Sequence, residues 1–333
     1  EIAKANYPNL RLFSQTAVFA SETKENVSDG IWQSCTSDTV GEFSAVAYYF
    51  GKELLSEITD VPVGLISSSV GGSAIEQWMT SGKSNLEGFE YRADYPVQVH
   101  YNAMMYPFSN LSIKGALWYQ AESNANKNTP LYSQLLKNLT SEMRTAFHDA
   151  NLPVLVVQLP KYSSATISST MWAFMREQQA LAVKDTPNTY LAVTIDTGEQ
   201  NNIHPTNKAP VGERLGLLAL NKVYGKANIK SDAPVFASAQ ENSSDIVITL
   251  NHVYDGITGS AAGWFEIAGD NMNFVPASYE IQADNTIKVW SNDVSTPKYV
   301  RYGFKNYIDG ECLKNSEGLP LAPFRTDTAA FTY

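Results

Sequence analysis

Hydrophobic positions in the first two-thirds of the chain alternate between short apolar runs and stretches with helical spacing. Apolar side chains recur at helical period from Phe43 to Ile58, after Thr39 and Glu42, which have the spacing of a capping box. Further helices are predicted over 129–147, with Thr129 as N-cap, over 171–183 and over 210–224. Apolar runs predict buried strands over 62–69, 113–119, 153–159 and 189–195. This alternation predicts an α/β fold, with a mainly parallel sheet covered by helices on both faces.

The pattern changes at about residue 231. Short runs with strand composition, separated by Asn, Asp, Gly and Pro, lie at 235–239, 245–250, 263–268, 278–282, 286–290 and 298–304. No helical period accompanies them, so this part is expected to form a small antiparallel β-domain, a sandwich or part of one. We therefore expect two domains, 1–230 and 231–333.

Charge and composition limit the kinds of partner that this protein is expected to bind. The chain has 24 basic and 34 acidic residues, a net charge of −10, so it is a poor match for a phosphate backbone and no nucleic-acid partner is expected. No apolar run reaches the roughly 18 residues of a membrane helix, so no membrane partner is expected.

Cys35 and Cys312 either pair in an exported protein or are two core thiols. The low charge and the many Asn, Ser, Thr and Tyr residues favour a secreted or periplasmic protein.

Polar residues follow three of the predicted strands at their carboxyl ends, where an open parallel sheet binds its ligands. The six candidates from these stretches are Gly72, Gln120, Glu122, Asn124, Asp196 and His204. Together they resemble the base, orienting carboxylate and oxyanion donors of an acyl-transfer hydrolase.

Each candidate also has a structural interpretation. Gly71-Gly72 can be a simple tight turn, and Glu122 and Asn124 can be capping or turn residues. His204 lies in an Ile-His-Pro segment that does not suit a core, which favours a general base. No pair of His residues has metal-ligand spacing, so neither a metal nor an organic cofactor is expected.

The segment Trp118-Tyr119-Gln120-Ala121-Glu122-Ser123-Asn124 resembles the Trp-Tyr-Gln-Gly-Glu-Ser-Asn block of the sialate O-acetylesterase family, within the SGNH (GDSL-like) hydrolases. Further matches are the segments 43–51, 61–66 with Gly71-Gly72, Glu76 and Trp78, 101–104, Ile203-His204-Pro205 with Lys208, 265–269 and 318–327. The resemblance implies a flavodoxin-like parallel sheet and removal of acetyl groups from sialic acids or related glycans. An acetylxylan esterase and an inactive carbohydrate-binding relative are the alternatives.

Roles are implied by the same resemblance. His204 takes the general-base position, and Asp196 or Glu122 orients it, with Asp196 preferred because it leaves the same strand end as His204. The N–H of Gly72 and the side chain of Gln120 or Asn124 bind the oxyanion. The chain departs from the family at Ala121, where the family has Gly, and at Val70 and Ser73, where it has Trp and Thr.

The family's nucleophile is absent from the sequence. It is the Ser of a Gly-Gln-Ser-Asn-Met block that follows an interior strand, and no such block occurs in the 333 residues. An unfilled interior position would leave backbone groups of two strands unpaired, at about 1–3 kcal/mol for each buried group. We therefore expect an N-terminal fragment of the same precursor, ending just before Glu1, to bind this chain and to supply the strand and its Ser.

Overall fold

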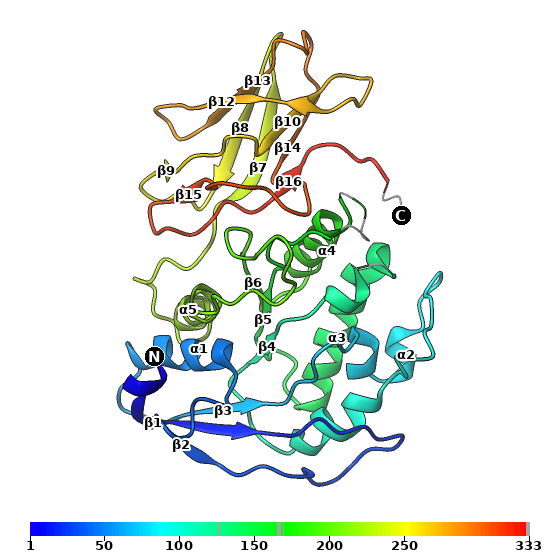
Figure 1. Cartoon of the computed structure of the whole chain (residues 1–333), viewed down its shortest axis with the longest axis vertical. Coiled ribbons are helices and arrows are strands. Elements are labelled where there is room, and N and C mark those ends of the chain that lie inside the picture. Colours follow the sequence, from blue (N-terminus) through cyan, green and yellow to red (C-terminus); the bar gives the residue numbers. More distant parts are fainter. Residues whose placement is uncertain (126, 165–167, 169, 331–333) are drawn as a thin grey trace. The chain divides into compact units, whose positions relative to one another are not determined.

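The computed structural model describes residues 1–125, 127–164, 168 and 170–330 (Figure 1). The chain divides into two compact units. The first unit consists of residues 1–157, 178–192 and 207–230. The second unit consists of residues 158–177, 193–206 and 231–333, so it contains the residues directly after the strands β5 (Val154–Val157) and β6 (Thr189–Ala192) as well as the C-terminal region.

Two three-stranded sheets form the centre of the first unit. One has the order β2-β1-β3, with β1 (Asn6–Ser14) parallel to β3 (Val63–Ser67) and antiparallel to β2 (Gln33–Thr36). The other is wholly parallel, in the order β4-β5-β6, with β4 (Ala116–Trp118), β5 (Val154–Val157) and β6 (Thr189–Ala192). Among the described residues, β3 and β4 therefore each pair with a neighbouring strand on one edge.

One apolar core joins the two sheets. Helices α1 (Ala45–Leu55) and α5 (Ala209–Leu218) pack against each other over this core, which includes Leu10 and Leu65 from one sheet and Leu155 from the other. All four residues of β5 are buried, and successive side chains point to opposite faces, so both faces of β4-β5-β6 are covered. This is the parallel, doubly covered arrangement that the sequence predicts.

Two glycines permit the close packing of α1. A Cβ on Gly212 of α5 would lie 2.6 Å from the Val46 carbonyl oxygen, and one on Gly51 would lie 2.6 Å from Leu10 Cδ1. Larger residues at either position would push the helices apart or lift α1 from the sheet.

The remaining helical elements are mostly short. Two long ones are α3 (Tyr132–Ala146) and α4 (Met171–Lys184). The short ones are η1 (Ile2–Lys4), η2 (Ile75–Trp78), α2 (Ser81–Ser84), η3 (Tyr101–Met105), η4 (Tyr106–Phe108), η5 (Glu122–Asn124), η6 (Thr129–Leu131) and η7 (Ala219–Val223). None of the helices in the described ranges combines the length and the hydropathy needed to cross a membrane.

The C-terminal part of the second unit is all β. One antiparallel sheet has the order β12-β13-β8-β7, and the other the order β11-β10-β14-β16. The two sheets contact each other through aromatic rings, since Phe265 lies 5.3 Å from Tyr279 and Phe236 lies 4.9 Å from Phe324 between ring centroids. The strands are β7 (Val235–Glu241), β8 (Ile246–Asn251), β9 (Ile257–Thr258), β10 (Phe265–Ala268), β11 (Val275–Pro276), β12 (Ser278–Ile281), β13 (Ile287–Trp290), β14 (Tyr299–Tyr302), β15 (Lys314–Asn315) and β16 (Phe324–Arg325).

The predicted fold class, an α/β sheet plus a C-terminal antiparallel β-region, is confirmed, and each predicted strand overlaps an observed one. Strands β1 and β2 were not predicted, because Pro8 and the many polar residues around them obscure the alternation of Leu10 and Leu12. The predicted capping box was wrong. Ser44 caps α1 by accepting from the Ala47 N–H, whereas Thr39 Oγ1 accepts from the Thr36 N–H in the preceding turn.

Candidate active site

The segment after β3 forms an open glycine turn. Gly72 has a φ of +75°, a conformation that favours glycine, and no atom lies within 4 Å of where its Cβ would be. The next residue, Ser73, is buried and holds the turn through Ser73 Oγ, which donates to the Val70 carbonyl at 2.8 Å and accepts from Trp78 Nε1 at 2.9 Å. The backbone of Gly72 is therefore open on the side where a Cβ would lie, and the contacts of Ser73 hold the turn in place.

Gln120, the second residue after β4, is tied to this turn. Its Nε2 donates to the Ser73 carbonyl at 3.0 Å and to Asn124 Oδ1 at 2.8 Å, and its Oε1 accepts from the Tyr132 hydroxyl at 2.9 Å. An amide nitrogen carries two protons, so both donors of Gln120 are engaged inside the protein. The Gln120 side chain therefore connects the loop after β3 to the loop after β4.

Asn124 completes the connection. Its Oδ1 also accepts from the Ile75 N–H at 3.1 Å, while its Nδ2 donates to Glu76 Oε2 at 2.9 Å. Nearby, Ser123 Oγ donates to the Gly72 carbonyl at 2.7 Å. Three predicted site residues, Gly72, Gln120 and Asn124, therefore belong to one hydrogen-bonded group at the carboxyl ends of β3 and β4.

Glu76 was a motif match in the sequence but was not predicted as a site residue. Its carboxylate is 1% exposed, and its Oε1 lies 4.0 Å from Arg92 Nη2. The Arg92 guanidinium stacks on Tyr95 at 3.7 Å from the ring centroid. A buried carboxylate bonded to a candidate oxyanion donor orients that donor. The signal available in the sequence was one acidic residue inside the otherwise uncharged segment 61–82.

Ala121 and Glu122 form the start of the same loop. Ala121 is fully buried with a φ of +158° and a ψ of −13°, a strained conformation for a residue with a Cβ. Its N–H donates to Glu122 Oε2 at 2.9 Å. Burial, followed by the charge of Glu122, raises the pKa of Tyr119 well above its usual value.

Asp196 and His204 lie in the second unit, in the segment that follows β6. His204 is exposed, and its backbone N–H donates to Asn202 Oδ1 at 3.0 Å. Asp196 Oδ2 lies 3.3 Å from Lys314 Nζ of β15. The sequence predicted that both residues follow a strand of the parallel sheet, and β6 does end at Ala192.

His100 and the two cysteines are buried. His100 is buried between Phe19 and Trp78, at 4.8 and 4.9 Å between ring centroids, and burial lowers its pKa. Within the described ranges, no group of three His, Cys, Asp or Glu residues is arranged to hold a metal ion. Cys35 and Cys312 are both buried and are not joined in a disulfide.

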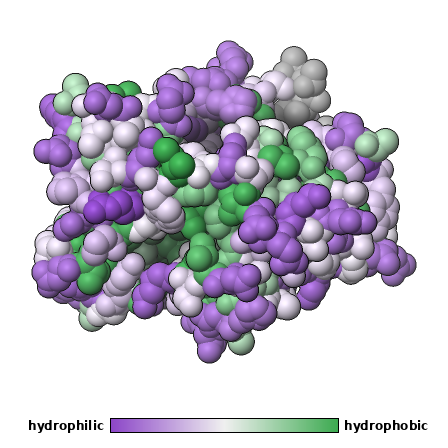
Figure 2. Space-filling view, turned by 90° about the horizontal axis from the view of Figure 1, so that it is seen from below, coloured by the Kyte–Doolittle hydropathy of each residue, from purple (hydrophilic) through white to green (hydrophobic). Residues whose placement is uncertain are grey.

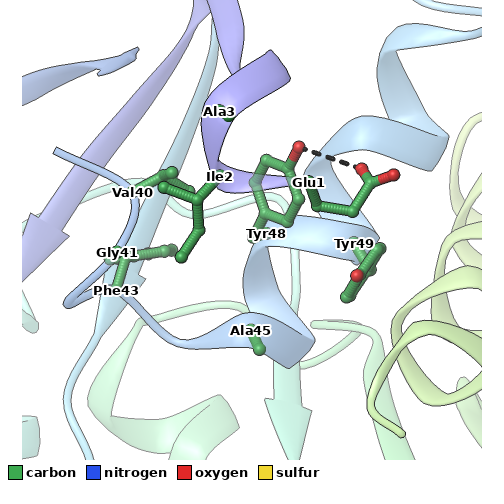
Figure 3. Close-up of a pocket in the computed structure, with 9 residues that line it drawn as sticks. All are labelled: Glu1, Ile2, Ala3, Val40, Gly41, Phe43, Ala45, Tyr48 and Tyr49. Carbon is green, nitrogen blue, oxygen red and sulfur yellow. Dashed lines mark hydrogen bonds between the residues drawn. The ribbon is translucent and has the colours of Figure 1, made fainter. Parts of the chain in front are cut away.

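A separate pocket of about 460 Å³ lies beside the beginning of β1 (Figure 3). Its lining is mainly apolar, with Ile2 and Phe43 among the side chains, and the Tyr48 hydroxyl donates to Glu1 Oε2 across it at 3.4 Å. None of the six candidate site residues lines it, so it is not part of the hydrogen-bonded group around Gly72.

Comparison with known proteins gives consistent matches. The model of the family described as carbohydrate esterase, sialic acid-specific acetylesterase, matches residues 20–221. Human sialate O-acetylesterase is 30% identical over 263 residues, covering 69% of this chain and 50% of that protein, and the mouse enzyme is 27% identical over 306 residues, covering 74% and 56%.

Among solved structures, a carbohydrate acetylesterase from Xanthomonas citri superposes with a TM-score of 0.90 at 34% identity, covering 98% of this chain and 75% of that chain. The present chain spans about half the length of the curated mammalian relatives. The family model covers well over half of the chain, and the fold and the loop after β4 agree with it. The chain therefore belongs to the sialic acid-specific acetylesterase family of carbohydrate esterases.

Proposed function

We propose that this protein is a carbohydrate O-acetylesterase that removes acetyl groups from sialic acids or related O-acetylated glycans. The observation that carries the proposal is the hydrogen-bonded group of Gly72, Gln120 and Asn124 at the carboxyl ends of β3 and β4. Family membership and the names of the human and Xanthomonas relatives support the same chemistry. No cofactor is invoked.

The oxyanion of the tetrahedral intermediate is bound in this proposal by Gly72 N–H and Asn124 Nδ2. In this proposal Gln120 is not an oxyanion donor, because both of its amide protons already serve Ser73 and Asn124. Asn124 Nδ2 uses one proton on Glu76 and keeps a second for the substrate.

His204 acts as the general base, taking the proton of the attacking Ser and giving it to the ester oxygen of the sugar, which leaves as a hydroxyl. Asp196 orients His204 and steadies the imidazolium, with Glu122 as the competing carboxylate. The loop position of Asp196, four residues after β6 ends, supports this choice. The carboxylate of Glu122 instead accepts a hydrogen bond from the N–H of the preceding residue, Ala121. Asp196→Asn and Glu122→Gln variants decide between them, since the larger loss of turnover marks the orienting residue.

The nucleophilic Ser is supplied, in our proposal, by a strand that inserts in parallel between β3 and β4. The two sheets share one core but are not joined by hydrogen bonds between these two strands. A parallel strand in that position would end between Gly72 and Gln120, where a Ser after it would meet the proposed oxyanion donors.

The surface offers further support for a bound segment. Seen from the side of β1 and β3, hydrophobic side chains gather in a hollow across the middle of the molecule (Figure 2). Large apolar residues just before β2 and β3 are exposed, with Ile31 at 70%, Trp32 at 51% and Val61 at 56%. Apolar surface of this kind usually marks an interaction site. An N-terminal fragment of the same precursor is the proposed partner.

Purified native protein tests the proposal in two steps. Mass spectrometry should find a second polypeptide carrying a Gly-Gln-Ser-Asn-Met-like block, either separate or joined to this chain. The intact protein should hydrolyse aryl acetates and release acetate from O-acetylated sialic acid, and His204→Ala should abolish both activities. Preference for acetylated xylan would overturn the substrate class, and binding of the glycan without hydrolysis would mark an inactive relative.

We also propose that the protein is secreted or periplasmic, on the basis of its low charge and glycan substrate. Fractionation of the producing cells should recover it outside the cytoplasm. Recovery with cytosolic markers would contradict this proposal.

A further inference from the structure

The loop that carries His204 is organised around the carboxylate of Glu199. Glu199 Oε1 accepts from the Thr206 N–H at 2.7 Å and from Thr206 Oγ1 at 2.8 Å, while Oε2 accepts from Asn202 Nδ2 at 3.0 Å. Asn202 and Thr206 lie two residues before and two residues after His204. The Glu199 carboxylate thus binds the side chain of Asn202 before the proposed base and the backbone N–H and hydroxyl of Thr206 after it.

Asn202 transmits this contact to His204 itself. Because Asn202 Nδ2 points to Glu199, its Oδ1 is the atom left to accept from the His204 N–H, at 3.0 Å. Glu199, Asn202 and His204 therefore form a short chain of hydrogen bonds. The Glu199 carboxylate at one end sets which atom of Asn202 donates and which accepts.

The first residues of this loop are held by contacts that do not involve the Glu199 side chain. Lys161 N–H donates to the Thr197 carbonyl at 3.3 Å, and Ser163 N–H donates to the Gln200 carbonyl at 3.0 Å. Gly198, with a φ of +103°, fits closely here, since a Cβ would lie 2.2 Å from the Lys161 carbonyl oxygen. Loss of the Glu199 carboxylate should therefore disturb the part of the loop around His204 and leave its attachment intact.

We propose that Glu199 is a positioning residue that fixes His204 for proton transfer; this inference rests on the proposed function. A carboxylate is required because both of its oxygens accept. In Glu199→Gln, one oxygen is replaced by an NH₂ group, which would face the donors of either Thr206 or Asn202. The mismatch releases one side of the loop, and small displacements of a reacting group can reduce turnover by about 100-fold.

The experiment compares Glu199→Gln and Glu199→Asp with the control Glu241→Gln, which removes a carboxylate paired with Lys298 in the β-region of the same unit. All are made in the intact active protein. The measurements are kcat and KM for an aryl acetate, the midpoint of thermal unfolding, and hydrogen exchange of the His204 and Thr206 amides. His204→Ala is measured in parallel.

We expect Glu199→Gln to lower kcat by roughly 10- to 100-fold, with KM and the unfolding midpoint close to wild type and with faster exchange of both amides. Glu199→Asp should regain part of the lost turnover, and Glu241→Gln should change neither kcat nor the exchange of the His204 and Thr206 amides. Wild-type kcat in Glu199→Gln, or a loss that tracks a fall in the unfolding midpoint, overturns the inference. If His204→Ala remains active, the proposed function fails instead, and the two failures are distinguished.

Discussion

Glu76 Oε2 accepts a hydrogen bond from Asn124 Nδ2 at 2.9 Å, and this contact sets the direction of the Asn124 amide. A carboxylate can only accept, so the amide nitrogen must face Glu76 and the amide oxygen must face Ile75 N–H and Gln120 Nε2. The orientation of the proposed oxyanion donor is therefore decided by a residue that itself lies outside the Gly72–Gln120–Asn124 set.

Replacing Glu76 by Ala should destabilise the protein. It leaves the Asn124 amide without its buried acceptor and the Arg92 guanidinium without the carboxylate charge 4.0 Å away, at an expected cost of about 3 kcal/mol in the free energy of unfolding. Urea unfolding measures the change. The control is Glu90→Gln, which alters an exposed carboxylate paired with Lys127 and should change stability by less than about 1 kcal/mol. Equal effects from the two variants would contradict the proposed role of Glu76.

Replacing Asn124 by Ala should lower kcat for acetyl ester hydrolysis by about 100- to 1,000-fold, because a donor to the developing oxyanion is lost. The matched change Ser123→Ala removes a neighbouring hydroxyl that bonds the Gly72 carbonyl and should reduce kcat only a few-fold. Steady-state kinetics on the intact protein, with circular dichroism as a check of folding, make the comparison. A folded Asn124→Ala variant with nearly normal turnover would show that Asn124 does not bind the oxyanion.

Replacing Ala121 by Gly should stabilise the chain by about 1 kcal/mol. The strained φ of +158° costs about 1–3 kcal/mol for a residue with a Cβ, which exceeds the added entropy cost of glycine in the unfolded chain. Ala125, which is also buried but has a φ of −67°, provides the control. Ala125→Gly should destabilise by about 1 kcal/mol. Thermal unfolding distinguishes the two, and destabilisation by both variants would mean that Ala121 is not strained.

Asp327 gives the C-terminal β-region a predictable dependence on pH. Burial acts to raise its pKa, but hydrogen bonds from Arg301 and the Ala329 N–H, with the charges of Arg301 and Arg325, lower it below the usual 3.8. A carboxyl whose folded pKa is lowered stabilises the protein above its unfolded pKa, and this contribution is lost as pH falls through the folded pKa.

Asp327→Asn should therefore lower the free energy of unfolding by about 3 kcal/mol at pH 7, and the difference from wild type should shrink below about pH 4. Urea unfolding at pH 7, 5 and 3 measures it. Asp293→Asn, at an exposed position, should match wild type at all three values. A difference that stays constant down to pH 3 would rule out the ionised carboxylate as its source.

The sequence by itself predicted most of the helices and strands and the loops in which the candidate site residues lie. Periodicity and composition located β3 to β6, the long helices and, after residue 231, β7, β8, β10, β12, β13 and β14, because burial on one or both faces leaves a repeating pattern in the residues. The two-residue strands β9, β11, β15 and β16 were not predicted, since they are too short to show a pattern. The block from Trp118 to Asn124 and the Ile203-His204-Pro205 segment were selected because they hold residue types that acyl-transfer chemistry uses. β1 was missed, since only Leu10 and Leu12 alternate clearly among its residues.

Only the tertiary structure decided how the polar side chains pair. Gln120 and Asn124 were equivalent oxyanion candidates in the sequence, and the contacts to Ser73 and Glu76, 47 and 48 residues away along the chain, are the reason for proposing Asn124. Likewise, nothing in the residues around His204 predicted that Glu199 would collect hydrogen bonds from both sides of it. Hydrogen-bond partners depend on where the backbone brings each donor and acceptor in space, and a local sequence pattern carries no record of that distance.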